Sequence, residues 1–365
     1  MKVLISGSSV AGPALAYWLH GHCAEVTVVE RAPAPRTGGQ AIDVRGVALG
    51  VVERMGLLEP LRAVRTRMRG SSMLDADGNE LFRSTEHAPS SGRLDSDDLE
   101  ILREDLTGLL TERTTGVEYV FGDSIAALSQ DDDGVDVTFE RGGPRRFDLV
   151  VGADGLHSKV RRLAFDPQSR HVHHLGMYLA VYTTDNMLGL DNWQIWLRDD
   201  TAGAGIYPAR DNTELRVNVG FFADPIDYDH RDLDAQRQLV AERAASLGWE
   251  MPRLLKAMWH APDFYFDAMA QVRLDSWSNG RITLVGDAAY CASPMSGQGT
   301  SLALVGAYVV ADELARSGGD PRAALGRYEA RMRPFAELNQ ALATENLGAP
   351  AAEESIERAK WAITL

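Results

Sequence analysis

The chain begins with a strand, a turn of small residues, a helix and a second strand. Residues 3–19 read VLISGSSVAGPALAYWL, and a second apolar strand, Glu25 to Val29, then ends at Glu30. Gly7 permits a tight turn, and Gly12 permits close packing of the helix on the sheet. A parallel sheet with helices on its faces accommodates this order, so we expect an α/β fold that opens with a dinucleotide-binding unit.

The turn of this unit predicts a pyrophosphate site. Backbone N–H groups at the start of the helix, from Ser9 through Val10 and Ala11, can face an anion. Ser9 replaces the middle glycine of the usual pattern, and its small side chain still lets a pyrophosphate approach. Glu30 stands where a carboxylate takes ribose hydroxyls, and a solvated strand end is the alternative for this residue.

Two further segments repeat the arrangement of strand, glycine turn and helix. Residues 149–162 read LVVGADGLHSKVRR, in which an apolar strand ends at Asp154-Gly155 and Ser158 and Arg161 fall on the opening helical turn. Residues 282–304 read ITLVGDAAYCASPMSGQGTSLAL. This last corner suits a polyol attached to a flat ring, although such a turn alone is more often a packing device.

In the last segment, Asp287 can accept hydrogen bonds from hydroxyl groups. Glycine lets the backbone approach a bulky ligand, and the helix start offers free N–H groups to an electron-rich ring edge. The residues concerned are Gly286, Asp287, Pro294, Gly297, Gln298, Gly299 and Thr300.

Two arginines fall where a cofactor could pass. Arg45 ends the alternating segment Gln40 to Arg45, which we expect to be a short strand near the cofactor; a surface salt bridge is an equal alternative for Arg45. Arg103 begins the helical part of residues 99–113, where a cation opposes the helix dipole. This suggests another partner, such as a phosphate or a carbonyl, although the residue by itself favours an exposed surface position.

From about residue 167 to 276 the strands become longer and more aromatic. The segment 71–92, with a hairpin signal at Asp77-Gly78, is another excursion from the nucleotide-binding fold. These segments could form a sheet-rich layer that covers a ligand with aromatic side chains such as Trp196 and Phe221. Alternation of this kind is also typical of an ordinary core.

Composition excludes several classes of protein. The formal net charge of −15 disfavours a nucleic-acid or anionic membrane surface, and no apolar run is long enough to span a membrane. The chain has two cysteines, Cys23 and Cys291, and this number is too small for a disulfide framework or a cysteine-rich metal site. The acidic turn Asp131 to Asp133 lacks the ligand spacing of a calcium loop. We therefore expect a cytoplasmic protein without a metal.

Together, the three glycine motifs resemble those of the class A FAD-dependent monooxygenases, the para-hydroxybenzoate hydroxylase superfamily. The match covers nearly the whole chain, and the tetracycline-inactivating and antibiotic-tailoring flavin hydroxylases are the most similar group. The resemblance implies a Rossmann-like FAD-binding domain of the glutathione-reductase type, an inserted sheet-rich substrate domain and a C-terminal helix. The expected boundaries are 1–70, 94–166 and 274–325 for FAD binding, 71–93 and 167–273 for substrate, and 326–365 for the helical end.

The same resemblance implies roles for individual residues. Glu30 would hold the adenosine ribose, Arg31 would lie against the adenine, and Asp287 would bind the ribityl chain. Pro294 and Gly297 belong to the loop beside the isoalloxazine, where oxygen reacts, so they are the candidate catalytic positions. The other FAD contacts implied are Gly7, Ser9, Val10, Ala11, Gly12, Arg45, Arg103, Asp154, Gly155, Gly286, Gln298, Gly299 and Thr300, and the substrate contacts are Gln194, Trp196, Arg210 and Phe221. Tyr290 stands where the family commonly has histidine.

The activity implied is hydroxylation of a small organic substrate, aromatic or polyketide-like, through a flavin C4a-hydroperoxide. NADPH or NADH would donate electrons, O2 would be the co-substrate, and the enzyme would be a monomer or dimer. The alternatives are a flavin-dependent halogenase or reductase on the same fold, and a catalytically silent flavoprotein that sequesters a small molecule. Trp193-Gln194-Ile195-Trp196 lacks the Trp-x-Trp-x-Ile-Pro spacing of such halogenases. A plain NAD-dependent dehydrogenase is disfavoured, because it would have no use for the motifs at Asp154-Gly155 and Gly286-Asp287.

Overall fold

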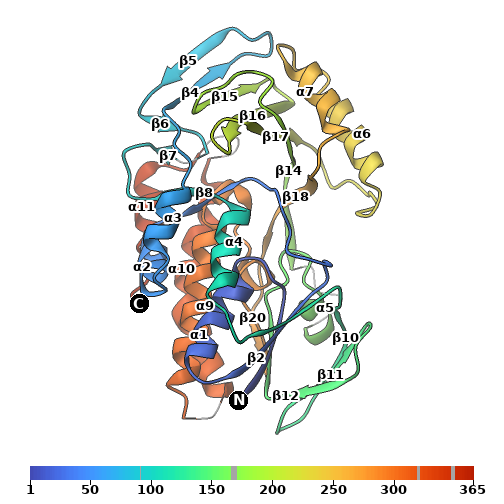
Figure 1. The fold of residues 1–365 in the computed structure, drawn as a ribbon, viewed down its shortest axis with the longest axis vertical. Helices are drawn as coiled ribbons and strands as arrows, with labels where there is room; N and C mark the ends of the chain where they lie inside the picture. Colours follow the sequence, from blue (N-terminus) through green and yellow to red (C-terminus); the bar gives the residue numbers. More distant parts are fainter. Residues whose placement is uncertain (91, 166–170, 319–320, 347–349) are drawn as a thin grey trace.

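The structure is a computed structural model that describes residues 1–90, 92–165, 171–318, 321–346 and 350–365. Its elements form two parts, which are stacked along the long axis of the molecule in Figure 1. One part contains a six-stranded sheet and most of the helices, and the other contains a seven-stranded sheet. Each part has its own cluster of buried apolar side chains.

The six-stranded sheet is parallel except at one edge. Its strands lie in the order β19 (Ser278–Asn279), β20 (Ile282–Leu284), β13 (Leu149–Gly152), β1 (Lys2–Ser6), β2 (Glu25–Glu30) and β9 (Glu118–Phe121). All three glycine motifs follow strands of this sheet. Because β1, β13 and β20 run parallel, their carboxyl ends point the same way. The three motifs that follow these strands therefore lie together, along the side of the sheet where the strands end.

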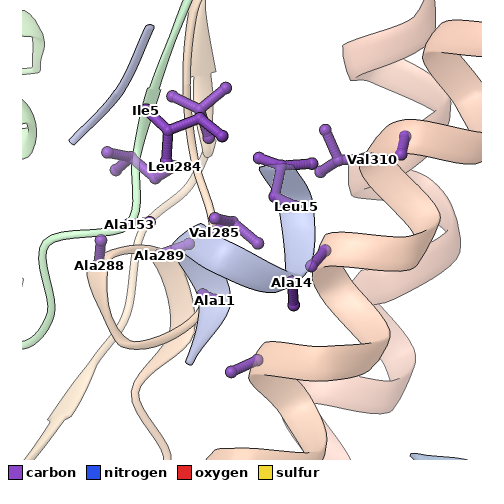
Figure 2. Close-up of a cluster of buried hydrophobic side chains, with 14 of the residues drawn as sticks. Ile5, Ala11, Ala14, Leu15, Ala153, Leu284, Val285, Ala288, Ala289 and Val310 are labelled. Carbon is purple, nitrogen blue, oxygen red and sulfur yellow. The ribbon is translucent and has the colours of Figure 1, made fainter. Parts of the chain in front are cut away.

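Helix α1 (Ala11–Gly21) joins β1 to β2 and packs against α9 (Gly299–Ala315). Figure 2 shows small side chains, including those of Ala11, Ala14, Ala288 and Ala289, between the sheet and these helices. Such side chains let the backbones approach closely. The other helices are α2 (Val47–Arg54), α3 (Leu58–Val64), α4 (Arg103–Glu112), α5 (Lys159–Ala164), α6 (Leu233–Arg243), α7 (Met251–Met258), α8 (Asp287–Tyr290), α10 (Pro321–Glu345) and α11 (Glu353–Lys360), with a 3-10 turn at Pro294–Ser296.

The seven-stranded sheet gathers strands from two separate stretches of chain. Its order is β18 (Phe264–Val272), β14 (Val172–Asp185), β17 (Glu214–Phe222), β16 (Ala202–Ala209), β15 (Trp193–Arg198), β4 (Gly70–Leu74) and β5 (Glu80–Ser84). The turn at Asp77-Gly78 lies between β4 and β5, so the predicted hairpin is confirmed. Helices α6 and α7 lie beside this sheet in Figure 1, and their apolar side chains join its core.

Three smaller sheets complete the fold. Strands β10 (Ile125–Gln130), β11 (Val135–Phe139) and β12 (Arg145–Phe147) form one, and their buried residues belong to the core of the six-stranded sheet. The other two are β3 (Ala41–Val44) with β8 (Leu99–Leu102), and β6 (His87–Ala88) with β7 (Gly92–Arg93). None of the described helices combines the length and apolar character needed to cross a membrane.

Gly12 should be essential for the packing of α1, and Gly21 in the same helix provides a control. A Cβ at Gly12 would lie 1.9 Å from the carbonyl oxygen of Gly7, whereas one at Gly21 would meet nothing within 4 Å. We expect Gly12→Ala to destabilise the protein by about 1–3 kcal/mol, since the backbone must move. Gly21→Ala should be neutral or stabilise by less than about 1 kcal/mol. Urea unfolding measures both, and equal midpoints would contradict the packing argument.

Candidate functional site

One large cavity lies between the two parts of the molecule and is lined by residues of both. Its volume is about 2670 Å³, well above the range of about 300–1,000 Å³ that a single drug-sized ligand occupies. We call it the central cavity. The glycine motifs line one side, and the seven-stranded sheet lines the other with residues such as Leu179, Trp196 and Tyr207. It has room for a large cofactor and a second molecule.

The N-terminus of α1 opens on the central cavity without a side-chain cap. Val10 occupies the cap position and gives no side-chain hydrogen bond, and Ser9, Val10 and Ala11 line the cavity. The first N–H groups of a helix have no partner within the helix, so these amides are available to an anion. Gly7 holds a positive φ of 111° in the turn, and a Cβ there would lie 2.4 Å from the carbonyl oxygen of Ala153.

The N-terminus of α9 opens on the same cavity and is also uncapped. Gln298 is the cap residue and gives no side-chain cap, while Gly299 and Thr300 line the cavity. The preceding loop turns at Ser293 and Gly297, which have φ values of 74° and 63°. Pro294 and Gly297 line the cavity as well, so the loop expected beside a flavin ring is exposed to it.

Two carboxylates from different motifs reach the cavity. Glu30 accepts hydrogen bonds from the backbone N–H groups of Ser8, at 2.9 Å, and Ala32, at 2.8 Å, which orient its oxygens. Asp287 stands at the start of α8 with its side chain open to the cavity. The protein atoms around the Asp287 carboxyl partly desolvate it and raise its pKa. Both carboxylates can accept hydroxyl hydrogen bonds.

Asp154 lines the cavity but uses its oxygens to cap α5. It accepts from the backbone N–H of Lys159 at 2.8 Å and of Val160 at 3.0 Å, and from the Ser158 hydroxyl. Burial raises the pKa of the Asp154 carboxyl, while these hydrogen bonds oppose the shift. Gly155 has a φ of 78° and open space where a Cβ would stand, so a ligand can approach the backbone there.

The second and third motifs are joined by Arg161. This buried side chain donates to the carbonyl oxygen of Ala288 at 2.9 Å and to that of Leu156 at 2.6 Å. Arg161 therefore fixes the loop of Asp154 against the loop of Asp287. Its position on the opening helical turn was visible in the sequence, but its bridging role was not.

The three arginines expected at the cofactor all line the cavity. Arg31 is exposed at its edge. Arg103 donates to the carbonyl oxygen of Gly38 at 3.0 Å, so it has one of the two kinds of partner expected, and burial lowers the pKa of its guanidinium. Arg45 is buried and pairs with Asp43 at 2.9 Å, so the alternative of a surface salt bridge is wrong.

Three expected cofactor positions do not line the cavity. Gly12 and Gly286 are packing positions: a Cβ at Gly286, whose φ is 64°, would lie 3.2 Å from the Ala11 side chain. The side chain of Gln298 is completely buried, and among the described residues its amide atoms have no hydrogen-bond partner. The sequence predicted the packing role of Gly12, but it did not reveal that Gly286 also packs against Ala11 or that the Gln298 side chain is buried.

Of the four expected substrate positions, only Trp196 lines the cavity. Phe221 is buried on the opposite face of the sheet, stacked on Tyr178, because its neighbours in β17 take the cavity face. Gln194 is buried behind Trp196 and accepts its indole N–H at 2.9 Å. Arg210 lies in the β16–β17 turn and pairs with Glu104 and Asp105 of α4. These three residues do not line the central cavity.

The sheet contributes cavity residues that the sequence analysis missed. Asn218, Gly220 and Phe222 alternate with Phe221 along β17 and line the cavity, as does Met177 on β14. The polar Asn218 within the apolar run from Val217 to Phe222 was the available signal. Tyr290, in contrast, is buried against α9 and Tyr328 and does not line the cavity; burial raises its pKa to about 12. It packs the core.

One group of described residues has the donor set of a metal site. His157, His230 and Asp267 bring one ligand atom each to within 4.8 Å of one another. In the structure, the His157 Nε2 atom is 2.8 Å from Asp267 Oδ2, and Tyr265 donates to the same oxygen at 3.3 Å. These hydrogen bonds account for the approach of His157 to Asp267, and the His230 ring lies edge-on to that of His157.

The donor chemistry of the cavity fits FAD. Two uncapped helix starts supply amides for a pyrophosphate and for a ring edge, and two carboxylates stand where hydroxyls could bind. The open face at Gly155 and the open space at Gly299, where a Cβ would have Asp287 as its nearest neighbour at 3.9 Å, leave room for a flat ligand.

Comparison with known proteins agrees with this geometry. Residues 1–343 match the family described as FAD binding domain. The chain is 52% identical over 366 residues to an uncharacterized protein of Mycobacterium tuberculosis strain H37Rv, covering 100% of this chain and 98% of that one. It is 41% identical over 362 residues to a flavin-dependent monooxygenase of an unknown prokaryotic organism, covering 97% and 93%.

Among solved structures, tetracycline destructase Tet(55) is similar, with a TM-score of 0.89 and 37% identity over 100% of this chain and 98% of that one. The chain belongs to the FAD binding domain family, and it is an FAD-dependent monooxygenase of class A. The α/β fold with a Rossmann-like FAD domain and a second, sheet-rich part is confirmed.

Gly299 offers a test of the α9 site that spares the fold, with Gly326 of α10 as the control. A side chain has room at both positions, since a Cβ at Gly326 meets nothing within 4 Å. We expect Gly299→Leu to weaken FAD binding about tenfold or more, because leucine would occupy the space before the free amides. Gly326→Leu should bind FAD normally. Fluorescence titration with FAD measures affinity, and thermal unfolding of the free proteins checks that both fold.

Proposed function

We propose that the protein hydroxylates a small organic substrate with electrons from NADPH or NADH and one oxygen atom from O2. The observation that carries the proposal is that the uncapped starts of α1 and α9 and the apolar face of the seven-stranded sheet open on one cavity. A cofactor bound by the helix starts would therefore face a substrate held by the sheet. On this basis we also propose residues 71–93 and 167–273 as the substrate domain.

The cofactor end of the cavity would hold FAD along the sheet edge. The amides of Ser9 to Ala11 would receive the pyrophosphate, Glu30 the adenosine ribose, and Asp287 the ribityl hydroxyls. Arg31 would lie against the adenine, and Arg45 and Arg103 would offset the negative charge of the phosphates and ring. The other contacts we propose are the backbone at Gly7, Asp154, Gly155, Pro294, Gly297, Gly299 and Thr300.

When bound, FAD supplies the redox chemistry by the route that the family resemblance implies. The overall reaction balances as substrate C–H, O2, NAD(P)H and one proton giving substrate C–OH, NAD(P)+ and water. The chain's own part is to hold the substrate in place, exclude water and direct the amides of Gly299 and Thr300 at the negative charge that develops on the ring. No side-chain acid or base needs to be assigned for that role.

The chemistry of the sheet side favours a flat, largely apolar substrate with some polar groups. Trp196, Leu179, Met177 and Phe222 present apolar surface, and Asn218 offers an amide for orientation. An aromatic or polyketide-like compound matches this lining. The similarity to a protein named tetracycline destructase makes tetracyclines the first compounds to try.

A direct assay separates this function from the alternatives. The purified protein should be yellow, and its NAD(P)H oxidation in air should accelerate with one member of a panel of tetracyclines, phenols and other polyketides. The product should be 16 Da heavier than the substrate, the mass of one oxygen atom, as read by mass spectrometry. A yellow protein that never consumes NAD(P)H would favour the silent flavoprotein, and failure to take up FAD would overturn the cofactor assignment.

Trp196 should position the substrate without contributing to FAD binding. Trp196→Ala removes an aromatic wall of the cavity, so we expect KM to rise about tenfold and more NAD(P)H to be spent on hydrogen peroxide, while FAD affinity is kept. Trp259, which is 40% exposed and does not line the cavity, is the matched control. Steady-state kinetics with a peroxide assay gives the comparison, and an unchanged KM for Trp196→Ala would remove this residue from the substrate site.

A further inference from the structure

Two buried carboxylates face each other beside the cofactor end of the central cavity. Strands β3 and β8 pair antiparallel, and their register places Asp43 directly opposite Glu100. Asp43 is 9% exposed and Glu100 is 7% exposed. Like charges directly opposite each other in a strand pair are destabilising, and burial increases that cost. The register therefore opposes ionisation of both groups at once.

Arg45 is the cation that this pair shares. Its Nη2 atom lies 2.9 Å from Asp43 Oδ2, while its buried Nε atom and Glu100 Oε1 have no hydrogen-bond partner among the described residues. The other oxygen of Glu100 accepts from the Thr66 hydroxyl. One guanidinium can balance one carboxylate, so the second negative charge is left without an equal partner.

The remaining charged groups around the pair do not supply that balance. Asp98, from the loop before β8, adds a negative charge, and Lys360 of α11 pairs with it at 3.0 Å. Lys360 also pairs with Glu357 at 2.6 Å. The Tyr207 hydroxyl approaches from β16, and burial together with the charge of Glu100 raises the pKa of Tyr207. The carboxyl groups around Arg45 thus outnumber the cations that could balance them.

Arg45 also faces the loop that we assign to the flavin. A Cβ on Gly297 would lie 3.6 Å from its Nη1 atom, and Asp43 and Arg45 both line the cavity. A ligand anion beside this guanidinium would compete with Asp43 for the same positive charge. Anything that weakens the pairing of Asp43 with Arg45 favours the protonated acid.

We propose that Asp43 and Glu100 share one proton at neutral pH, and that this proton and an anionic cofactor held at Arg45 bind cooperatively. The shared proton is a property of the protein alone. The cooperative binding rests on the proposed function, because it takes FAD as the anion. The pair would make the charge around Arg45 depend on pH, so that the cavity accepts an anion without a net gain of buried negative charge.

The electrostatics of the individual groups agree with a shared proton. Burial raises the pKa of Asp43 to about 7, and the charges of Glu100 and Asp98 act in the same direction while Arg45 opposes them. Burial also raises the pKa of Glu100. Because the two acids interact strongly, the titration belongs to the pair rather than to either residue.

Infrared spectroscopy of the FAD-free protein tests the shared proton directly. At neutral pH we expect the carbonyl band of a protonated carboxylic acid, which weakens in Asp43→Asn and in Glu100→Gln because the remaining acid then has Arg45 to itself. Glu313→Gln, which should leave the band unchanged, is the control: Glu313 is equally buried but pairs with Arg327 at 2.8 Å and Arg331 at 3.4 Å. No such band in the wild type, or a band whose intensity neither substitution lowers, would overturn the proposal.

The dependence of stability on pH provides a second, independent test. The folded pKa of Asp43, about 7, lies above its ordinary value of 3.8, so the folded state binds more protons between these values and loses stability as pH rises through that window. Asp43→Asn should remove this loss. Its urea midpoint relative to wild type should therefore be higher at about pH 8 than at about pH 5. An equal difference at both pH values would contradict the shared proton.

Calorimetric titration with FAD tests the coupling to the cofactor. Near neutral pH, wild-type binding should take up protons, seen as a difference in heat between buffers of different ionisation enthalpy, and Asp43→Asn should take up fewer. Above that range, wild-type affinity should fall by up to about tenfold per pH unit, the limit for one proton. FAD binding with equal proton uptake in both proteins overturns the coupling. Absence of FAD binding would instead refute the proposed function, while the infrared result would still decide the shared proton.

Discussion

Two helix N-termini without side-chain caps, those of α1 and α9, open on one cavity, and the site depends on this pairing. They meet because β1 and β20 run parallel in one sheet, on either side of β13, and so end at the same edge. Free amides at a helix start require water or a ligand as partner. A cofactor with a phosphate group and a polar ring edge can satisfy both ends at once, so it contributes to the hydrogen bonding of the fold as well as to chemistry.

The second glycine motif, at Asp154-Gly155, has the opposite arrangement, and the contrast explains its role. Asp154 and Ser158 satisfy the first amides of α5, so this helix start has little to offer an anion. The capped helix instead positions Arg161, whose guanidinium holds the carbonyl oxygen of Ala288 beside Asp287. The first and third motifs thus present amides to the cavity, and Arg161 of the second motif holds the third in place. Asp154 and Gly155 still form part of the cavity wall.

The sequence predicted the α/β class and the strand, turn and helix of each motif, because glycine and small residues at those turns leave few alternatives. Gly12 is required by its close approach to the carbonyl oxygen of Gly7, and Gly7 by its positive φ in the turn. Residues of the second sheet were harder to predict, since neighbouring positions of a strand face opposite sides and no local pattern says which side is the cavity. Phe221 was therefore placed on the wrong face. The bridge from Arg161 to Ala288 joins residues 127 positions apart and could only be seen in the structure.

Side chains alternate between the two faces of the seven-stranded sheet, and this is why the prediction for Phe221 failed. The same alternation places the residues that stabilise the core on one face and the residues that line the cavity on the other. One face of β14 and β17 packs Tyr178 and Phe221 with Phe266 into the second core, together with α6 and α7. The other face lines the cavity with residues such as Asn218 and Phe222. Because the two sets do not share a face, cavity positions can change without creating voids in the core. A fold built this way can keep one cofactor site while the substrate it accepts varies.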